Sequence, residues 1–356
     1  MSKSFLFQFQ KYIVLLLPIF LVTGPFLPDL AIVLASIIFL YLSIKNKLWI
    51  YYKNKFFLFF LFFYITLLIS SLLSQDVFFS LESSLFYFRF GLFSLSVWFL
   101  LDHDKDFLKL FFYVLLLMFG ILIFDGFFQY FTGSNLMGLP YNASKARLSS
   151  FFGDEWVYGN YLSRLFPLLF ALAIFRYREP KKIIILLCLF ILASDVIIYL
   201  SGERIAFFNL IFGTVLMIIL LDKFKWVRII SFVASLIIII TLSVNHNQIK
   251  LRMIDNTINQ INFFSENYVA DHELFVISSF KMFKDNMIIG VGPKMYRKLC
   301  DNENYYVSNE FWNSCSTHPH NIYLQLLSET GMIGFIFILA IFIYILFLLL
   351  INFKNK

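Results

Sequence analysis

The sequence is poor in charge and in cysteine for its length. Only 14% of the 356 residues are charged, whereas an ordinary soluble domain carries about 25%. Apolar residues make up 60%, and the mean hydropathy is +0.80. Three cysteines exclude a disulfide-rich secreted scaffold, and the high apolar content excludes a soluble globular enzyme and a disordered chain. The composition indicates a protein whose main solvent is lipid.

Long apolar runs recur along the chain. Crossing the hydrocarbon core takes about 20 apolar residues. Ten segments approach this length, at 12–27, 29–44, 56–73, 84–101, 107–124, 158–175, 182–200, 205–221, 226–244 and 332–352. Gly24, Pro25 and Pro28 separate the first two, which could instead be one broken helix with a re-entrant end. We expect an all-α, polytopic integral membrane bundle of about ten transmembrane helices.

The runs divide the chain into three expected parts. Residues 1–244 form a membrane bundle of about nine helices, residues 245–319 form one large, partly helical loop, and residues 320–356 form a short polar helix and the last span. Lys and Arg cluster near both ends and beside the turns at 45–55, 102–109, 176–182 and 222–228. Because cytoplasmic loops carry an excess of Lys and Arg, both termini should be cytoplasmic, and the segments 125–157, 201–204 and 245–319 should face outward.

The segment 315–331 carries the most informative polar residues on that outer side. Pro319 suits the first position of a helix and Gly331 suits its stop. The helix between them would carry a polar stripe of Asn321, Gln325 and Ser328. His320 would project from the first turn, where the helix dipole lowers the pKa of a histidine. A neutral imidazole accepts a proton, so His320 is a candidate general base; a histidine that merely caps the helix is the alternative.

Arg204 is the second candidate, at an abrupt turn between two apolar spans. An arginine near membrane depth usually has a functional or structural reason, and its planar fork suits a phosphate or diphosphate. The alternative is an interfacial arginine paired with Glu203.

Two further arginines flank the span at 158–175. Arg147 precedes it and Arg164 lies within it, so either could face the same anionic ligand. For Arg164, a buried pair with Asp125 or Glu155 is the alternative. Arg89, in the fourth predicted span, is similar and has no evident partner in the sequence.

The remaining chemistry-bearing residues form no dedicated metal or cofactor site. His318 and His320 are two residues apart and do not share a helical face, and the sequence contains no P-loop, no G-x-G-x-x-G and no serine-nucleophile motif. The basic charge signals topology and not nucleic-acid binding. Cys300 and Cys315 could form a disulfide, worth about 3 kcal/mol for a loop of this size, or remain free thiols.

Four motifs together resemble those of the O-antigen ligase/polymerase superfamily of bacterial inner-membrane proteins. The first is His-Asn-x-x-Leu-x-x-x-x-Glu-x-Gly, here His320, Asn321, Leu324, Glu329 and Gly331. The others are the turn at 201–206, the polar segment 147–162 that leads into a span, and Gly290-Val-Gly-Pro293 in the large loop. They occur in order over about 147–335 and fit the predicted topology.

This resemblance implies a metal-independent, inverting transfer of a glycan from an undecaprenyl-diphosphate carrier to an acceptor on the periplasmic side. A ligase uses a sugar hydroxyl of lipid A–core, and a polymerase, the close alternative, uses the end of another lipid-linked repeat unit. His320 would be the general base, Arg204 would hold the diphosphate, and Arg147 would assist. We expect these three side chains to meet in one outward-facing cleft.

Two departures from the family pattern add candidate residues. His272 stands near the place of a further arginine in the large loop, and either His272 takes part of that role or Arg252 or Arg297 folds in. Glu155 replaces an amide in the polar segment and could bind sugar hydroxyls. A lipid or polysaccharide transporter is the alternative from another class, since Arg89 and Arg164 would fit a conduction path.

Overall fold

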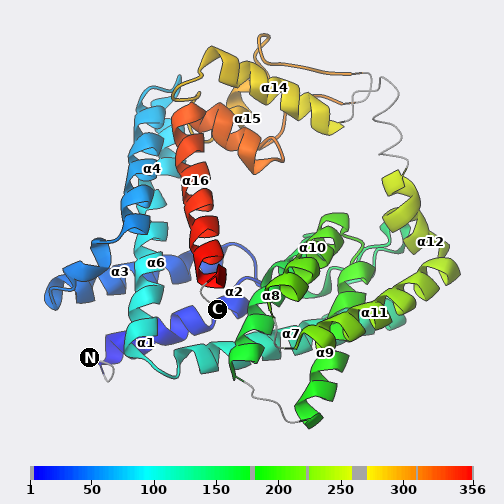
Figure 1. Cartoon of the computed structure of the whole chain (residues 1–356). Coiled ribbons are helices and arrows are strands. Elements are labelled where there is room, and N and C mark those ends of the chain that lie inside the picture. Colours follow the sequence, from blue (N-terminus) through cyan, green and yellow to red (C-terminus); the bar gives the residue numbers. More distant parts are fainter. Residues whose placement is uncertain (1–3, 177–180, 222–223, 259–270, 310–311, 355–356) are drawn as a thin grey trace. The chain divides into compact units, whose positions relative to one another are not determined.

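A computed structural model of the chain describes residues 4–176, 181–221, 224–258, 271–309 and 312–354 (Figure 1). The structure is 77% helical, and these ranges contain no β-strand. The prediction of an all-α, polytopic membrane protein is therefore confirmed. The predicted turns at 176–182 and 222–228 fall partly outside the described residues.

The helices follow the predicted apolar runs with one exception. They are α1 (Phe5–Leu15), α2 (Leu17–Phe20), α3 (Phe26–Lys45), α4 (Lys55–Leu72), α5 (Val77–Ser84), α6 (Phe88–His103), α7 (Phe107–Thr132), α8 (Tyr158–Arg176), α9 (Lys181–Leu200), α10 (Arg204–Leu220), α11 (Lys225–Asn245), α12 (Asn247–Lys250), α14 (Asp271–Asp285), α15 (Tyr296–Leu299) and α16 (Ile322–Lys354). Seven stretches in the described ranges are long and apolar enough to cross a membrane, and the stretches Ile185–Leu200 and Arg204–Leu220 are shorter apolar helices.

The exception is the first predicted span, 12–27, which is not one helix of spanning length. Helix α1 ends at Leu15, the short helix α2 follows, and α3 begins only at Phe26. Pro18 lies in the first turn of α2, where a missing N–H group is tolerated, but it prevents α1 from continuing. Gly24, with φ of 102°, then turns the chain toward α3.

The chain forms two compact units. The first unit contains Met1–Ala31 and Leu100–Asn262, and the second contains Ile32–Phe99 and Phe263–Lys356. Arg147, Arg204 and Arg252 belong to the first unit, and His320 belongs to the second.

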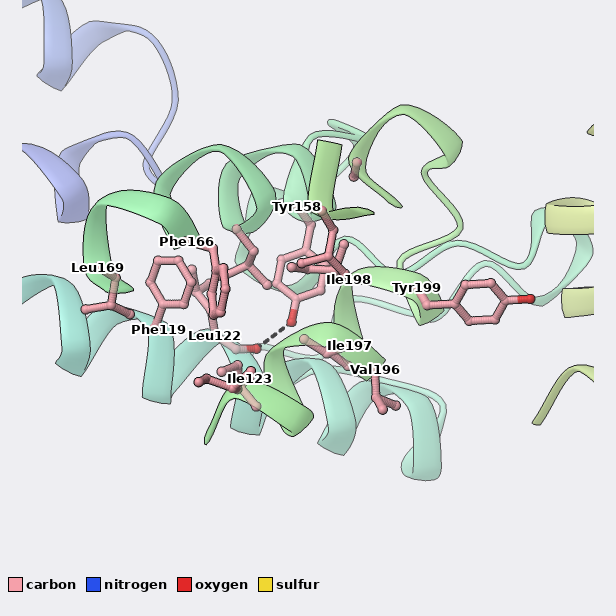
Figure 2. Close-up of a cluster of buried hydrophobic side chains, with 14 of the residues drawn as sticks. Phe119, Leu122, Ile123, Tyr158, Phe166, Leu169, Val196, Ile197, Ile198 and Tyr199 are labelled. Carbon is pink, nitrogen blue, oxygen red and sulfur yellow. Dashed lines mark hydrogen bonds between the residues drawn. The ribbon is translucent and has the colours of Figure 1, made fainter. Parts of the chain in front are cut away.

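The core of the first unit lies between α7, α8 and α9. Tyr158, at the start of α8, is fully buried and donates a hydrogen bond of 2.7 Å to the carbonyl oxygen of Leu122 (Figure 2). The rings of Phe119 and Phe166 pack in the same cluster. This hydrogen bond anchors the first residue of α8 in the core, so the loop that precedes α8 ends at a fixed point.

A buried ion pair joins α9 and α11. Arg228, at the end of the basic turn 222–228 that was used to predict the topology, is fully buried, and its Nη1 donates to Asp195 Oδ2 at 2.6 Å. A second guanidinium nitrogen donates to Thr214 of α10, and the rings of Phe166 and Phe232 flank the guanidinium. Removing one partner would leave a buried charge uncompensated, so this pair holds three helices in register.

In the second unit, the chain after α14 is fastened to α16 by backbone contacts. Gly331 has φ of 64° and kinks α16, as the predicted helix stop at this residue requires. A Cβ at Gly331 would clash with the backbone of Ile288, and a Cβ at Gly290 would clash with that of Glu329. Val291 N donates to the carbonyl oxygen of Ser328 at 2.9 Å. The glycines thus permit a backbone-to-backbone contact that no larger residue allows.

Candidate active site

Two loops of the first unit meet where Arg147 and Arg204 lie. Arg147 is in the connection between α7 and α8, and Arg204 is the first residue of α10. Leu148 N donates to the carbonyl oxygen of Ser201 at 3.4 Å, and Gly202, with φ of 72°, lies against the backbone of Ala146. A Cβ at Gly202 would clash with the Ala146 carbonyl oxygen, so this glycine permits the close approach of the two loops.

Glu203, between Gly202 and Arg204, has a structural role at the start of α8. Its carboxylate accepts hydrogen bonds from Gly159 N at 2.6 Å, from Asn160 N at 3.1 Å and from Asn160 Nδ2 at 2.6 Å. Burial raises the pKa of the Glu203 carboxyl, while these hydrogen bonds and the charge of Arg147 act in the opposite direction. The first N–H groups of a helix have no acceptor within the helix. The carboxylate of Glu203, in the turn that carries Arg204, accepts hydrogen bonds from two of these groups in α8.

A third arginine joins this place. Arg252 lies in the helical turn Leu251–Asp255, and its Nε donates to the carbonyl oxygen of Gly202 at 3.2 Å. Burial, together with the positive charges of Arg147 and Arg204, lowers the pKa of Arg252 to about 10. Burial also lowers the pKa of Arg147, where Glu203 acts in the opposite direction and Arg204 adds to the lowering. We call Arg147, Arg204 and Arg252 the arginine cluster.

The arginine cluster is suited to a ligand with several negative charges. All three side chains are only half-buried, so they remain accessible. Like charges held close together disfavour their own charged forms, and an anion between them reverses that effect. Guanidinium groups also present paired N–H donors that match phosphate oxygens. The geometry therefore fits a phosphate or diphosphate better than a single carboxylate.

The other candidates of the first unit lie apart from these contacts. Arg164 is on the exposed side of α8, and no ion pair of Arg164 occurs in the described part of the chain. Asp125, offered by the sequence as its buried partner, instead accepts hydrogen bonds from Leu136 N and Ser150 Oγ. That alternative is wrong because the loop after α7 folds back onto Asp125. Glu155 is exposed in the loop before α8.

His320 lies in the second unit, just before α16 and not in its first turn. Helix α16 begins at Ile322, and Asn321 caps it, with its Oδ1 accepting from Tyr323 N at 3.0 Å and Leu324 N at 3.2 Å. The predicted start at Pro319 is therefore wrong, because the Asn321 side chain caps the helix and its first residue is Ile322, three residues later. His320 has φ of 51°, a left-handed conformation that interrupts any helix there.

The exposed imidazole of His320 has defined neighbours in the second unit. Its Nε2 lies 3.1 Å from Ser316 Oγ, and its ring centroid is 5.1 Å from that of Phe275 and 4.4 Å from that of His318. Phe275 lies on α14, so the large loop after α12 is partly helical as predicted. His272 is in the first turn of α14, and its side chain lies outside the described part of the structure.

Glu329 and the loop near α15 support the helix that follows His320. The Glu329 carboxylate is buried and accepts from Tyr296 N at 3.3 Å and Gln325 Nε2 at 3.2 Å. Ser70 of α4 donates to the Glu329 carbonyl oxygen at 2.8 Å. The acidic residue of the sequence motif is therefore a scaffold residue that joins α4, α15 and α16.

Cys300 and Cys315 form a disulfide, with their Cα atoms 5.1 Å apart. Of the two alternatives left open by the sequence, the structure shows the bridge. Asp301 lies close to both sulfurs, but a disulfide does not present the thiolate that a metal ion requires. The bridge fixes the segment from which Ser316 and His320 extend.

The structure gives Trp156 and Gly202 contacts that were not predicted from the sequence. Trp156, to which no role was assigned, lies with its ring 5.4 Å from the guanidinium carbon of Arg147. Gly202 was identified as part of the turn at 201–206, but its contact with the loop of Ala146 was not predicted. A glycine between a helix end and an acidic cap, as in Ser-Gly-Glu-Arg, is the signal that could have indicated Gly202. Arg252 was considered only as one of two replacements for a loop arginine; Arg297, the other, is exposed in α15 of the second unit.

The fold and the cluster together define a multi-pass α-helical membrane protein with a cationic site beside its helix ends. The family model described as O-antigen ligase matches residues 186–339. This region is therefore similar to the O-antigen ligase family, within a multi-pass membrane protein. The match includes Arg204, Arg252 and His320, whereas Arg147 precedes it. A comparison with curated proteins and with solved structures found no match.

Proposed function

We propose that the protein is an inverting, metal-independent glycosyltransferase of the ligase type. It transfers a glycan from an undecaprenyl-diphosphate carrier to a sugar hydroxyl on the periplasmic side of the bacterial inner membrane. The observation that carries this proposal is the arginine cluster, in a chain whose residues 186–339 match the O-antigen ligase family. Three guanidinium groups supply the positive charge that a diphosphate leaving group needs.

The proposed reaction is a single displacement at the anomeric carbon of the donor. The acceptor hydroxyl oxygen attacks that carbon, and the bond between the carbon and the diphosphate oxygen breaks. The electron pair of the broken bond stays on undecaprenyl diphosphate, and the hydroxyl proton passes to His320. Attack opposite to the leaving group inverts the anomeric configuration.

The residues divide these tasks by their chemistry. Arg204 and Arg147 bind the diphosphate and stabilise the charge that develops on it, and Arg252 adds a third positive charge. His320 acts as general base in its neutral form. Arg164, Glu155, Asn321 and His272 complete the proposed substrate-binding set; the exposed carboxylate of Glu155 can accept hydrogen bonds from sugar hydroxyls.

The proposed orientation places both termini in the cytoplasm and the loops that carry the site in the periplasm. The disulfide between Cys300 and Cys315 supports this orientation, because disulfides persist in oxidising compartments such as the periplasm. The lysines near the two ends of the chain support the cytoplasmic position of the termini.

Reconstitution of the purified protein with a lipid-linked glycan tests the proposal. Lipid A–core and a second lipid-linked glycan are offered separately as acceptors, with a chelator present. A single addition to lipid A–core supports the ligase assignment. Chain growth on the lipid-linked glycan would identify a polymerase instead. Movement of the donor across the bilayer with no new glycosidic bond would overturn the enzymatic function in favour of transport.

A further inference from the structure

Two cavities of the first unit lie beside the arginine cluster. One, of about 340 Å³, is lined by Tyr141, Asn142, Asp154 and Trp156 among others. The second, of about 480 Å³, is lined by Tyr130, Tyr141 and the polar residues that connect α11 to α12. Tyr141 lines both cavities, so they adjoin at that ring. Both volumes lie within the range of about 300–1,000 Å³ that is usual for small-molecule sites.

We call the surface formed by Tyr130, Tyr141, Trp156, Asn247 and Gln248 the aromatic groove. At one end, the Trp156 ring lies over the guanidinium of Arg147 at 5.4 Å. At the other end, Asn247 and Gln248 belong to α12, and the turn that follows carries Arg252. The groove therefore contacts the arginine cluster at Arg147 and is connected along the chain to Arg252.

The aromatic groove combines flat apolar faces with neutral polar groups. The ring centroids of Tyr130 and Tyr141 are 6.2 Å apart with their planes at 70°, so the two rings form a corner. Tyr and Trp present an apolar body with a polar tip. Sugars have matching chemistry, because their C–H faces stack on aromatic rings while their hydroxyl groups reach amides and phenols.

Several polar groups in the groove have no protein partner. The Oη atom of Tyr130 is buried and has no hydrogen-bond partner in the described part of the chain. Asn247 and Gln248 are exposed, and no hydrogen bond of their side-chain amides occurs among the described residues. Buried polar groups in proteins are normally hydrogen-bonded. A ligand hydroxyl in this groove would give the Tyr130 phenol a hydrogen-bond partner, and the exposed amides could bond to further hydroxyls.

The aromatic groove and the arginine cluster differ in the charge of their lining residues. Asp154 is the acidic lining residue, and neither lysine nor arginine lines either cavity. The arginine cluster attracts an anion, whereas the groove suits an uncharged, hydroxyl-rich chain. A lipid-linked glycan has the same order of parts, with a diphosphate followed directly by sugars.

We propose that the aromatic groove binds the sugar residues of the donor glycan that adjoin its diphosphate. This inference rests on the proposed function, and it names the subsite that recognises the sugar. The acceptor glycan has similar chemistry, but the groove shares its unit and its loops with the arginine cluster, which favours the donor.

The test measures binding with two separated pieces of the donor. The oligosaccharide released by mild acid from lipid-linked glycan of the source cells is one probe, and undecaprenyl diphosphate without sugar is the other. We expect Tyr141→Ala and Asn247→Ala each to weaken oligosaccharide binding about tenfold, the loss expected for one aromatic or hydrogen-bonded contact. Both variants should bind undecaprenyl diphosphate as the wild type does. Arg204→Gln should bind undecaprenyl diphosphate more weakly and the oligosaccharide as tightly as the wild type.

Matched controls lie in the second unit. Tyr306→Ala and Asn304→Ala remove an exposed tyrosine and an exposed amide outside the groove, and they should leave both affinities unchanged. Tyr130→Phe deletes only the unpaired hydroxyl, so it still tests the groove if Tyr141→Ala does not fold. Purified lipid A–core oligosaccharide distinguishes the two glycans, because equal or tighter binding of this probe in the groove would assign the groove to the acceptor.

Two results would overturn the inference. One is that the released oligosaccharide does not bind the wild-type protein. The other is that it binds the groove variants as tightly as the wild type. Failure of the proposed function is recognised separately, since absence of transfer with intact oligosaccharide binding would refute the transferase and leave the groove standing.

Discussion

Arg252 Nε donates a hydrogen bond of 3.2 Å to the carbonyl oxygen of Gly202. The contact ties the turn after α12 to the turn that begins α10. It brings a third positive charge toward Arg147 and Arg204, and these two charges contribute to lowering the pKa of Arg252 to about 10. The free protein therefore holds three guanidinium groups in mutual repulsion until an anion binds.

Arg252 should govern the affinity for diphosphate at high pH. Its guanidinium is charged at neutral pH, and it loses its proton as the pH rises through about 10. A bound anion favours the charged form, so affinity should fall above pH 10 in the wild type. Without ligand, the free energy of unfolding of the wild type should increase as the pH rises above about 10. Deprotonation of Arg252 there removes a charge that the folded protein disfavours.

The matched variant is Arg252→Gln. It should bind undecaprenyl diphosphate about 10–100-fold more weakly at neutral pH, as expected for one charge-assisted hydrogen bond, and its affinity should not change further near pH 10. Its thermal unfolding temperature should stay close to that of the wild type, since one repelling charge is removed. A wild-type affinity that stays constant through this pH range would contradict the role of Arg252.

Replacing Arg204 by lysine should impair transfer although the charge is kept. A lysine supplies a point charge in place of a planar fork, and loss of one group that stabilises a developing anion costs about 100–1,000-fold in rate. The measurement is the transfer rate at saturating donor, with thermal unfolding as a check on folding. Near wild-type rates for Arg204→Lys would show that Arg204 is structural.

His320→Ala should abolish most transfer while donor binding persists. Loss of a general base typically lowers the rate by about 100–10,000-fold, whereas the proposed diphosphate contacts, in the arginine cluster, are unchanged. His318→Ala is the control, because His318 is exposed and its Nδ1 contacts Thr317. Equal transfer rates for His320→Ala and wild type would remove the base assignment, and equal losses in both variants would indicate a structural role for the pair.

Gly331→Ala should destabilise the second unit. The position has φ of 64°, and a Cβ there would clash with the backbone of Ile288; backbone strain of this kind costs about 1–3 kcal/mol. Gly120→Ala in α7 is the control, since no atom lies near its added Cβ and alanine favours helix. The thermal unfolding temperature should drop for Gly331→Ala and stay level or rise for Gly120→Ala. A Gly331→Ala protein as stable as the wild type would argue against the close backbone contact.

Local signals in the sequence predicted much of the fold and associated Arg204 with either Arg147 or Arg164, and the family resemblance favoured Arg147. Apolar runs of spanning length predicted most helices, because lipid demands such runs. Arg147 and Arg204 could be associated because each precedes a span that begins on the same side in the predicted topology. These inferences required only neighbouring residues and the alternation of the spans.

Contacts between distant segments could not be predicted in the same way. Arg252 joins the cluster through a carbonyl oxygen 50 residues away in the chain. Arg228 follows a basic turn of the kind that indicates topology, but it forms a buried ion pair with Asp195 of α9. At His320, the preference of proline for a helix start was overridden by the Asn321 cap. In each case a specific partner side chain or backbone group outweighed a local preference.

The anomeric configuration of the product distinguishes the proposed single displacement from other routes of transfer. The purified enzyme is given undecaprenyl-diphosphate-linked glycan of known configuration and a hydroxyl acceptor, with a chelator present, and the new linkage is determined by NMR. A single displacement gives an inverted linkage, formed with release of one undecaprenyl diphosphate for each glycan transferred. A retained configuration, or a transfer that stops until a divalent metal is restored, would contradict a single displacement supported by arginines and one histidine.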